Sequence, residues 1–290
     1  MNNARRIALS LSLCSLVACN GTPSKSHTSE DVRKVSSKPS ESPTGAVTEE
    51  EFKAMHVLRE SAAPELHGTM IDIGGTQAYL ALPPGAKVPL PAIVVIHEWW
   101  GLNDHVKHWA DRLASDGYAA VAVDLYGGVV ATTPDQAMSA MKSVDKDRSL
   151  QTMLAAYRFL AEDPRIQARH RASIGWCFGG GKSLQLALHA PELDAAVMYY
   201  GQPVMDAKTL ASLHAPLLGI FASRDQSFTP AIVKEFDEAL TAAGKQHTIL
   251  SYDAEHAFAN PSSGRYDERS AGEAWEHVRA FLAENLKDAR

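Results

Sequence analysis

The sequence predicts an α/β fold in which a mainly parallel sheet carries helices on both faces. Strand patterns and helix patterns alternate from about Gly68 to the end of the chain. Several predicted strands are continuous apolar runs, of which 91–97 (PAIVVIH) is the clearest, and such runs are typical of strands buried on both faces. A helix between successive strands is the connection that parallel strands require.

The elements follow in a regular order. Residues 69–73 and 77–82 are predicted to pair as a hairpin around Gly74-Gly75, which adds an antiparallel edge. The later predicted strands are 91–97, 119–125, 172–175, 195–200, 216–222 and 248–252. The predicted helices are 105–115, 134–144, 148–161, 179–189, 230–243 and 267–286. Functional side chains are then expected at the carboxyl ends of the strands.

The first 18 residues have the pattern of an export signal. Arg5 and Arg6 precede the apolar run 7–13, and Leu-Val-Ala-Cys at 16–19 resembles a bacterial lipobox. The alternative is a plain signal peptide with a chance cysteine. We expect an exported lipoprotein, held at the periplasmic or cell-surface face of a membrane by acyl chains on Cys19 rather than by a spanning helix.

Two further regions follow the signal. Residues 19–50 are predicted to be a flexible tether, because 20–48 are rich in Ser, Thr, Pro, Lys and Glu and contain almost nothing apolar. Residues 51–290 are predicted to form one domain. The residues Thr48-Glu49-Glu50-Glu51 indicate a capping box that opens a short helix through Arg59.

Composition excludes several classes of partner. The net charge of −6 comes with no concentrated basic segment, so nucleic acid is not expected to bind. The twelve histidines are scattered and neither HExxH nor CxxC spacing occurs, so we predict no metal site and no cofactor. We expect a monomer that acts on a small molecule. Loss of Cys14 and lipidation of Cys19 would leave Cys177 as a lone thiol in an oxidising compartment.

Cys177 follows a predicted strand and precedes a predicted helix. The sequence GWCFG at 175–179 matches the G-x-nucleophile-x-G pattern, in which a tight turn requires small residues on both sides of the nucleophile. The N-terminus of the following helix would favour a thiolate. The alternative is a buried structural cysteine. We therefore predict the α/β-hydrolase fold with Cys177 as its nucleophile.

The remaining triad members follow in the order expected for this fold. Asp225 comes after the predicted strand 216–222, and His256 comes after the predicted strand 248–252. An aspartate after a strand is also a common turn cap, and Asp253 and Glu255 are competing carboxylates. Order and position together predict a Cys177-His256-Asp225 triad that acts through an acyl-cysteine intermediate.

These stretches resemble the dienelactone hydrolase family over about 68–286. The resemblance lies in HEWWGLN at 97–103, GWCFGG at 175–180, RD at 224–225 and EHAF at 255–258. It implies an ester or lactone hydrolase in which Glu98 contacts the resting Cys177 and takes its proton when substrate binds; the alternative is a solvated loop carboxylate. The backbone N–H groups of Phe178 and Trp99 would form the oxyanion hole.

The sequence departs from the family where substrate is held. The family grips a substrate carboxylate with arginines, one of them four residues after the catalytic histidine, where this chain has Asn260. The loop 127–132 also lacks arginine; Arg265 is either a substitute or an exposed side chain. Trp100, Tyr126 and Phe258, together with Asn260, are predicted to line an aromatic pocket, unless they are simply core.

Three functions remain open at this point. The first is an ester or lactone hydrolase, and the second is a broad carboxylesterase, thioesterase or acyl-transfer enzyme unrelated to dienelactones. The third is a surface lipoprotein that binds without catalysis. The complete triad disfavours the third, and the missing arginine clamp leaves the substrate open.

Overall fold

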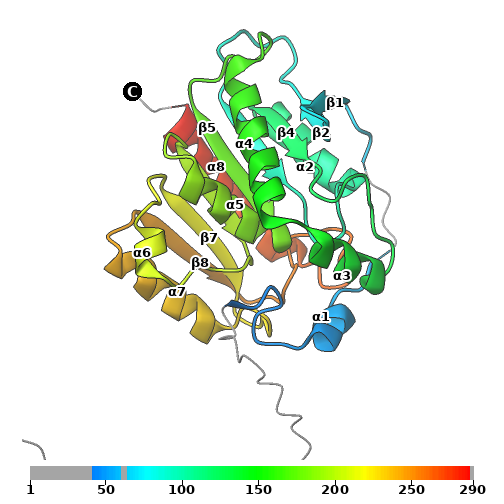
Figure 1. Ribbon diagram of the computed structural model, residues 1–290, viewed down its shortest axis with the longest axis vertical. Coiled ribbons are helices and arrows are strands. Elements are labelled where there is room, and N and C mark those ends of the chain that lie inside the picture. The colour runs from blue at the N-terminus through cyan, green and yellow to red at the C-terminus, as the bar shows by residue number, and fades with distance from the viewer. Residues whose placement is uncertain (1–40, 60–63, 288–290) are drawn as a thin grey trace, which may run out of the picture. The chain divides into compact units, whose positions relative to one another are not determined.

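An eight-stranded sheet organises the described part of the chain, residues 41–59 and 64–287 of the computed structural model (Figure 1). Its strand order is β1-β2-β4-β3-β5-β6-β7-β8. The strands β3 to β8 run parallel to one another, and the β1–β2 hairpin is antiparallel and pairs antiparallel with β4. The strands are β1 (Thr69–Ile73), β2 (Thr76–Ala81), β3 (Ala92–Ile96), β4 (Ala119–Val123), β5 (Arg171–Trp176), β6 (Ala195–Tyr199), β7 (Leu217–Ala222) and β8 (His247–Tyr252).

Helices cover both faces of this sheet. The helices are α1 (Glu49–Met55), α2 (Asp104–Ser115), α3 (Pro134–Ser143), α4 (Lys146–Glu162), α5 (Phe178–His189), α6 (Ala207–Leu210), α7 (Pro230–Ala242) and α8 (Glu268–Leu286). One apolar core lies under α1, α2, α3 and α8, and a second lies under α4, α5 and α7. The predicted mainly parallel sheet with helices on both faces and an antiparallel edge is confirmed; the one-turn helix α6 was not predicted.

The central strands show why apolar runs become strands here. Every residue of β3, β4 and β6 is buried, because each strand has a neighbour on both sides and helices above and below. Such strands need no polar alternation. By contrast, β1 lies at an edge of the sheet and keeps exposed positions such as Met70.

The predicted capping box forms, although the helix is shorter than expected. The Thr48 hydroxyl accepts from the backbone N–H of Glu51, and the Glu51 carboxylate accepts from the backbone N–H of Thr48. The helix α1 ends at Met55 rather than continuing to Arg59. Beyond it, Arg59 donates its N–H to the Ser262 carbonyl, so the chain pairs with a distant loop instead of with the preceding turn.

Residues 41–50, assigned from sequence to the tether, pack on the domain. Thr44 is buried, and the N–H of Ala46 donates to the Ser227 carbonyl at 2.8 Å, beside the loop that follows β7. The predicted signal segment and Cys19 lie outside the described residues. Among the residues described, no helix is both long and apolar enough to cross a membrane.

Candidate active site

Cys177 lies at the tight turn between β5 and α5, with φ +52° and ψ −117°. Residues other than glycine rarely adopt a positive φ of this kind, so the backbone at Cys177 is strained. A Cβ at Gly175 would lie 2.1 Å from the Gly179 carbonyl oxygen, and one at Gly179 would lie 2.3 Å from the Ile96 carbonyl oxygen. The two glycines are therefore required by close packing of backbone around the cysteine.

The structure brings together the three predicted triad residues. His256 Nε2 lies 3.3 Å from Cys177 Sγ, and His256 Nδ1 lies 2.7 Å from Asp225 Oδ2. Asp225 Oδ1 accepts from the backbone N–H groups of Ser227 and Phe228. Cys177, Asp225 and His256 are all at most 3% exposed. Because β5, β7 and β8 are parallel, the residues that follow them meet at one edge of the sheet.

Electrostatics favour a charged His256-Asp225 pair. Burial by itself lowers the pKa of His256, but the Asp225 carboxylate and Cys177 together hold that pKa well above its ordinary value. Burial opposes ionisation of Asp225, yet His256 and the two backbone N–H groups keep the pKa of this carboxyl below its ordinary value. The carboxylate therefore fixes Nδ1 as the protonated nitrogen, which leaves Nε2 for exchange with the sulfur.

Glu98 follows β3 and is 6% exposed. Its carboxylate accepts a hydrogen bond from the Tyr200 hydroxyl at 3.2 Å and another from the Asn260 amide. Burial raises the pKa of Glu98 to about 7, against the lowering effects of Asn260, His256 and Tyr200. Asn260, expected to line the substrate pocket, is a partner of this carboxylate.

A second histidine, which the sequence did not single out, also faces the cysteine. His56 Nε2 lies 3.9 Å from Cys177 Sγ, and His56 is 5% exposed. Its ring packs on Phe52 with centroids 4.1 Å apart. Burial and the nearby His256 lower the pKa of His56 to about 3, so its ring is neutral. No local pattern could have identified this approach, because His56 and Cys177 are 121 residues apart in sequence.

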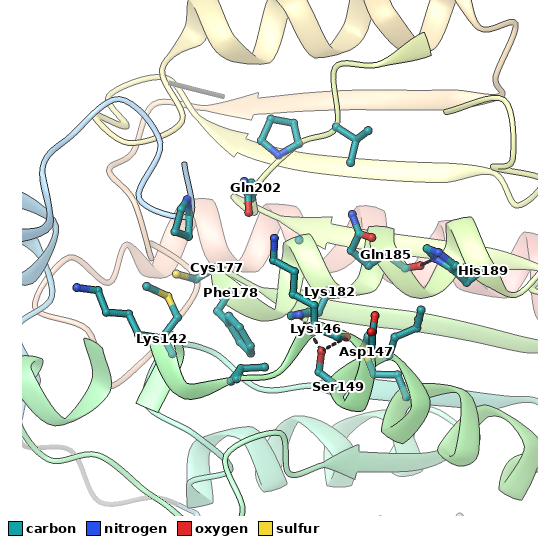
Figure 2. Close-up of a pocket in the computed structure, with 18 of the residues that line it drawn as sticks. Lys142, Lys146, Asp147, Ser149, Cys177, Phe178, Lys182, Gln185, His189 and Gln202 are labelled. Carbon is teal, nitrogen blue, oxygen red and sulfur yellow. Dashed lines mark hydrogen bonds between the residues drawn. The ribbon is translucent and has the colours of Figure 1, made fainter. Parts of the chain in front are cut away.

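A cavity of about 490 Å³ opens at Cys177 and Phe178. Apolar side chains from α3, α4 and the loop after β6 line much of it. Figure 2 shows Lys182 of α5 extending toward Ser149, whose hydroxyl accepts from Lys182 Nζ at 2.9 Å. Lys182 Nζ also lies 5.4 Å from the centre of the Phe178 ring. Lys182 was not among the residues predicted to line the site.

The other predicted pocket residues are buried around the triad. Trp100 packs edge-on against Trp99, Phe258 packs against Tyr200, and Tyr126 packs against His97. Within the described part of the chain, none of Trp100, Tyr126, Phe258 and Asn260 is among the residues that line the cavity at Cys177. Their predicted contact with substrate stays a prediction.

The predicted oxyanion donors occupy suitable places in the chain. Phe178 is the first residue of α5, where helix geometry leaves the backbone N–H without an intrahelical acceptor. Trp99 follows Glu98 in the loop after β3, and its indole is fully buried and edge-on to Phe52. The assignment of both N–H groups to an oxyanion hole stays a prediction.

A sheet with this strand order and a nucleophile elbow after β5 define the protein as an α/β-hydrolase. A model of the dienelactone hydrolase family matches residues 76–286, and the chain belongs to that family. The protein is therefore a hydrolase of the dienelactone hydrolase type. The resemblance inferred from its motifs is confirmed.

Several relatives support this placement. The chain is 29% identical over 243 residues to a Saccharolobus solfataricus protein named "Putative carboxymethylenebutenolidase", covering 71% of this chain and 93% of that protein. It is 31% identical over 224 residues to a protein of the same name from Methylorubrum extorquens, covering 72% and 77%. A Klebsiella pneumoniae structure titled "Putative Dienelactone Hydrolase" superposes with a TM-score of 0.68 at 28% identity, covering 76% of this chain and 99% of that one.

Close packing at the elbow predicts a strong effect of one added methyl group. We expect Gly179→Ala to lower the free energy of unfolding by about 3 kcal/mol or more, because the new Cβ meets backbone carbonyls that cannot move independently. The matched control is Gly272→Ala in α8, where a Cβ meets nothing within 4 Å, and a gain of about 0.5–1 kcal/mol is expected. Urea unfolding measures both, and equal stability of the two variants would contradict this account.

The raised pKa of Glu98 predicts a pH-dependent stability difference. The folded protein keeps the Glu98 proton up to about pH 7, whereas the ordinary carboxyl value is 4.5. The contribution of the protonated Glu98 carboxyl to the free energy of unfolding is therefore fully present below pH 4.5, and it is lost as the pH rises through 7. The free energy of unfolding of the wild type, relative to Glu98→Gln, should fall by on the order of 3 kcal/mol across this window. Unfolding curves at pH 4.5 and 8 measure it; a constant difference would show that Glu98 titrates normally.

Proposed function

We propose that the protein hydrolyses an ester or lactone through a Cys177-His256-Asp225 triad and an acyl-cysteine intermediate. The observation that carries the proposal is the buried chain of contacts from Cys177 Sγ to His256 Nε2 at 3.3 Å and from His256 Nδ1 to Asp225 Oδ2 at 2.7 Å. A thiol nucleophile, a base within reach and an acid that orients the base are the groups that this chemistry requires.

The first half-reaction forms the acyl-enzyme. The Cys177 thiolate attacks the carbonyl carbon of the ester, and the negative charge that develops on the carbonyl oxygen is held by the backbone N–H groups of Phe178 and Trp99. His256 then donates its Nε2 proton to the departing alkoxide as the carbon–oxygen bond breaks. The alcohol leaves, or stays tethered if the substrate is a lactone, and the acyl group remains on Cys177.

The second half-reaction releases the acid. His256 Nε2 takes a proton from a water molecule, which attacks the thioester carbon, and the carbon–sulfur bond breaks to regenerate the thiolate. Asp225 keeps the imidazole in the orientation and tautomer that both halves use. The step is a hydrolysis, so no oxidant or reductant is consumed.

Glu98 is proposed as the proton reservoir of the site. Its pKa of about 7 allows the carboxyl to hold or release a proton near neutral pH. In the resting arrangement its two oxygens are bonded to Tyr200 and Asn260. Transfer of the Cys177 proton to Glu98, as the family resemblance implies, therefore requires the carboxylate to give up at least one of these partners when substrate enters.

The cavity supports a small, partly apolar substrate. Its apolar walls suit the carbon skeleton of an ester, and Lys182 supplies a positive charge that a second, acidic group of the substrate can meet. The relatives named for carboxymethylenebutenolide hydrolysis are consistent with such a substrate. In this chain the charge would come from a lysine on α5 rather than from the arginine that follows the catalytic histidine in the family.

The triad assignment is tested by substitution of its members. We expect Cys177→Ala to lower kcat for p-nitrophenyl acetate by about 10³-fold or more, because the enzyme loses its nucleophile. Asp225→Asn should lower kcat by about 10²–10⁴-fold, because His256 loses the acid that orients it. The matched control is Asp253→Asn, since Asp253 is exposed and pairs with Arg224. Stopped assays under saturating ester measure kcat.

Two outcomes would contradict the assignment. Activity that persists in Cys177→Ala would remove the cysteine from the mechanism. A loss in Asp253→Asn equal to that in Asp225→Asn would remove Asp225 as the orienting acid. Absence of hydrolysis by the wild type with every ester and lactone tried would instead favour a binding protein.

We also propose that lipid on Cys19 anchors the protein at a bacterial membrane. The lipobox-like LVAC and the preceding apolar run support this, and two or three acyl chains hold a protein firmly. In a bacterium that processes lipoproteins, Cys19→Ser should move the full-length chain from the membrane pellet to the soluble fraction. Cys14→Ser, in the same segment, should leave it in the pellet; retention of Cys19→Ser there would refute the anchor.

A further inference from the structure

Three side chains that commonly bind metals meet at one point of the active site. His56 Nε2, Cys177 Sγ and His256 Nε2 all lie within 4.8 Å of one another, and all three residues are buried. The sulfur lies 3.9 Å from His56 Nε2 and 3.3 Å from His256 Nε2. The proposed hydrolysis uses two of these groups and leaves His56 without a part.

The sulfur–nitrogen separations are close to those of a tetrahedral zinc site. Zinc bonds of about 2.3 Å to sulfur and about 2.0–2.1 Å to nitrogen, at the tetrahedral angle, place sulfur and nitrogen about 3.6 Å apart. The two observed separations, 3.3 and 3.9 Å, fall on either side of that value. In such a site the two imidazole nitrogens lie about 3.3 Å apart. Here they lie within 4.8 Å of each other, so all three atoms bind one ion once the rings have closed to that separation, with the fourth position left for water.

The hydrogen bonds behind the two histidines also suit a metal. Histidines that bind zinc through Nε2 generally donate Nδ1–H to a carboxylate or a backbone carbonyl, which fixes the tautomer and the ring orientation. Here His256 Nδ1 bonds the Asp225 carboxylate at 2.7 Å, and His56 Nδ1 bonds the Phe52 carbonyl at 2.7 Å. Both partners require the proton on Nδ1, so Nε2 of each ring is the nitrogen that faces the sulfur, and His256 binds a metal there once its Nε2 proton has left.

His56 is held at this point by its own helix. The Phe52 ring stacks on it, and Trp99 packs against it with centroids 4.5 Å apart. Ion pairs from Lys53 to Asp135 and from Lys142 to Glu49 tie α1 to α3. The ligand is therefore part of a packed element, which is the condition for a site with defined geometry.

We propose that His56, Cys177 and His256 bind one Zn²⁺ ion and that the bound ion reversibly blocks the nucleophile. One thiolate and two imidazoles form a borderline-soft set that favours zinc over magnesium or calcium, which prefer oxygen. Binding forms one Zn–S and two Zn–N bonds, and any proton held on Cys177 Sγ or on His256 Nε2 is released to solvent. Zinc occupancy and attack by sulfur on an ester exclude each other.

Direct binding to the metal-free, full-length chain tests the proposal. Calorimetry with ZnCl₂ should give one tight site, and His56→Gln should weaken it at least a hundredfold, beyond the roughly 10–100-fold cost of losing an outer-shell partner. Cys177→Ala should weaken it comparably. The matched control is His214→Gln, an exposed histidine outside the site, which should bind as the wild type does.

Cobalt gives a readout that does not depend on hydrolysis. Co²⁺ in the wild type should show the intense visible bands of tetrahedral cobalt and a thiolate-to-metal charge-transfer band, and both should be absent in Cys177→Ala. Zinc should also slow alkylation of Cys177 by iodoacetamide, read on the tryptic peptide, at least tenfold in the wild type but not in His56→Gln.

The proposal fails if His56→Gln binds zinc as tightly as the wild type, or if cobalt binds without the charge-transfer band. It also fails if zinc leaves the alkylation of wild-type Cys177 unchanged. These outcomes are separate from failure of the proposed hydrolysis, because an inactive chain can still bind zinc at these residues. Circular dichroism of each variant confirms that a loss of binding is not a loss of fold.

Discussion

Close packing of backbone against backbone at the turn after β5 is the constraint on which the site depends. Gly175 and Gly179 leave no space for a Cβ, so the chain enters α5 directly from the strand and Cys177 is forced to a positive φ. That conformation costs free energy, which the fully buried strands on either side offset. In return, the cysteine reaches the edge of the sheet where β7 and β8 also end.

The second requirement is electrostatic. Three ionisable groups, Cys177, His256 and Asp225, lie where water is excluded, and an unpaired charge there would be costly. The chain compensates two of them: backbone N–H groups and the imidazole stabilise the Asp225 carboxylate, and Asp225 in turn stabilises a charged His256. Glu98 has weaker compensation from Tyr200 and Asn260, and its pKa accordingly lies near neutrality.

The sequence predicted the elements and the three residues of the candidate triad because both have local signals. Apolar runs identified the strands, and GWCFG identified the elbow, since its steric requirement acts within five residues. Other features depended on distant partners. Asn260 bonds Glu98, 162 residues away in sequence, a contact that was not predicted. The helix predicted through Arg59 ends at Met55 because Arg59 pairs with Ser262, a contact that no local pattern encodes.

By itself, then, the sequence determined the α/β-hydrolase fold and the family and singled out Cys177, His256 and Asp225 as the candidate triad, because these follow from periodicity, a steric motif and chain order. Only the tertiary structure decided what surrounds them. It placed His56, which follows α1, 3.9 Å from the Cys177 sulfur, put Lys182 in the wall of the cavity, and bonded Asn260 to Glu98. These contacts depend on packing between segments that are far apart in the chain. Such packing sets distances of a few ångströms, which the spacing of residues in the sequence does not predict.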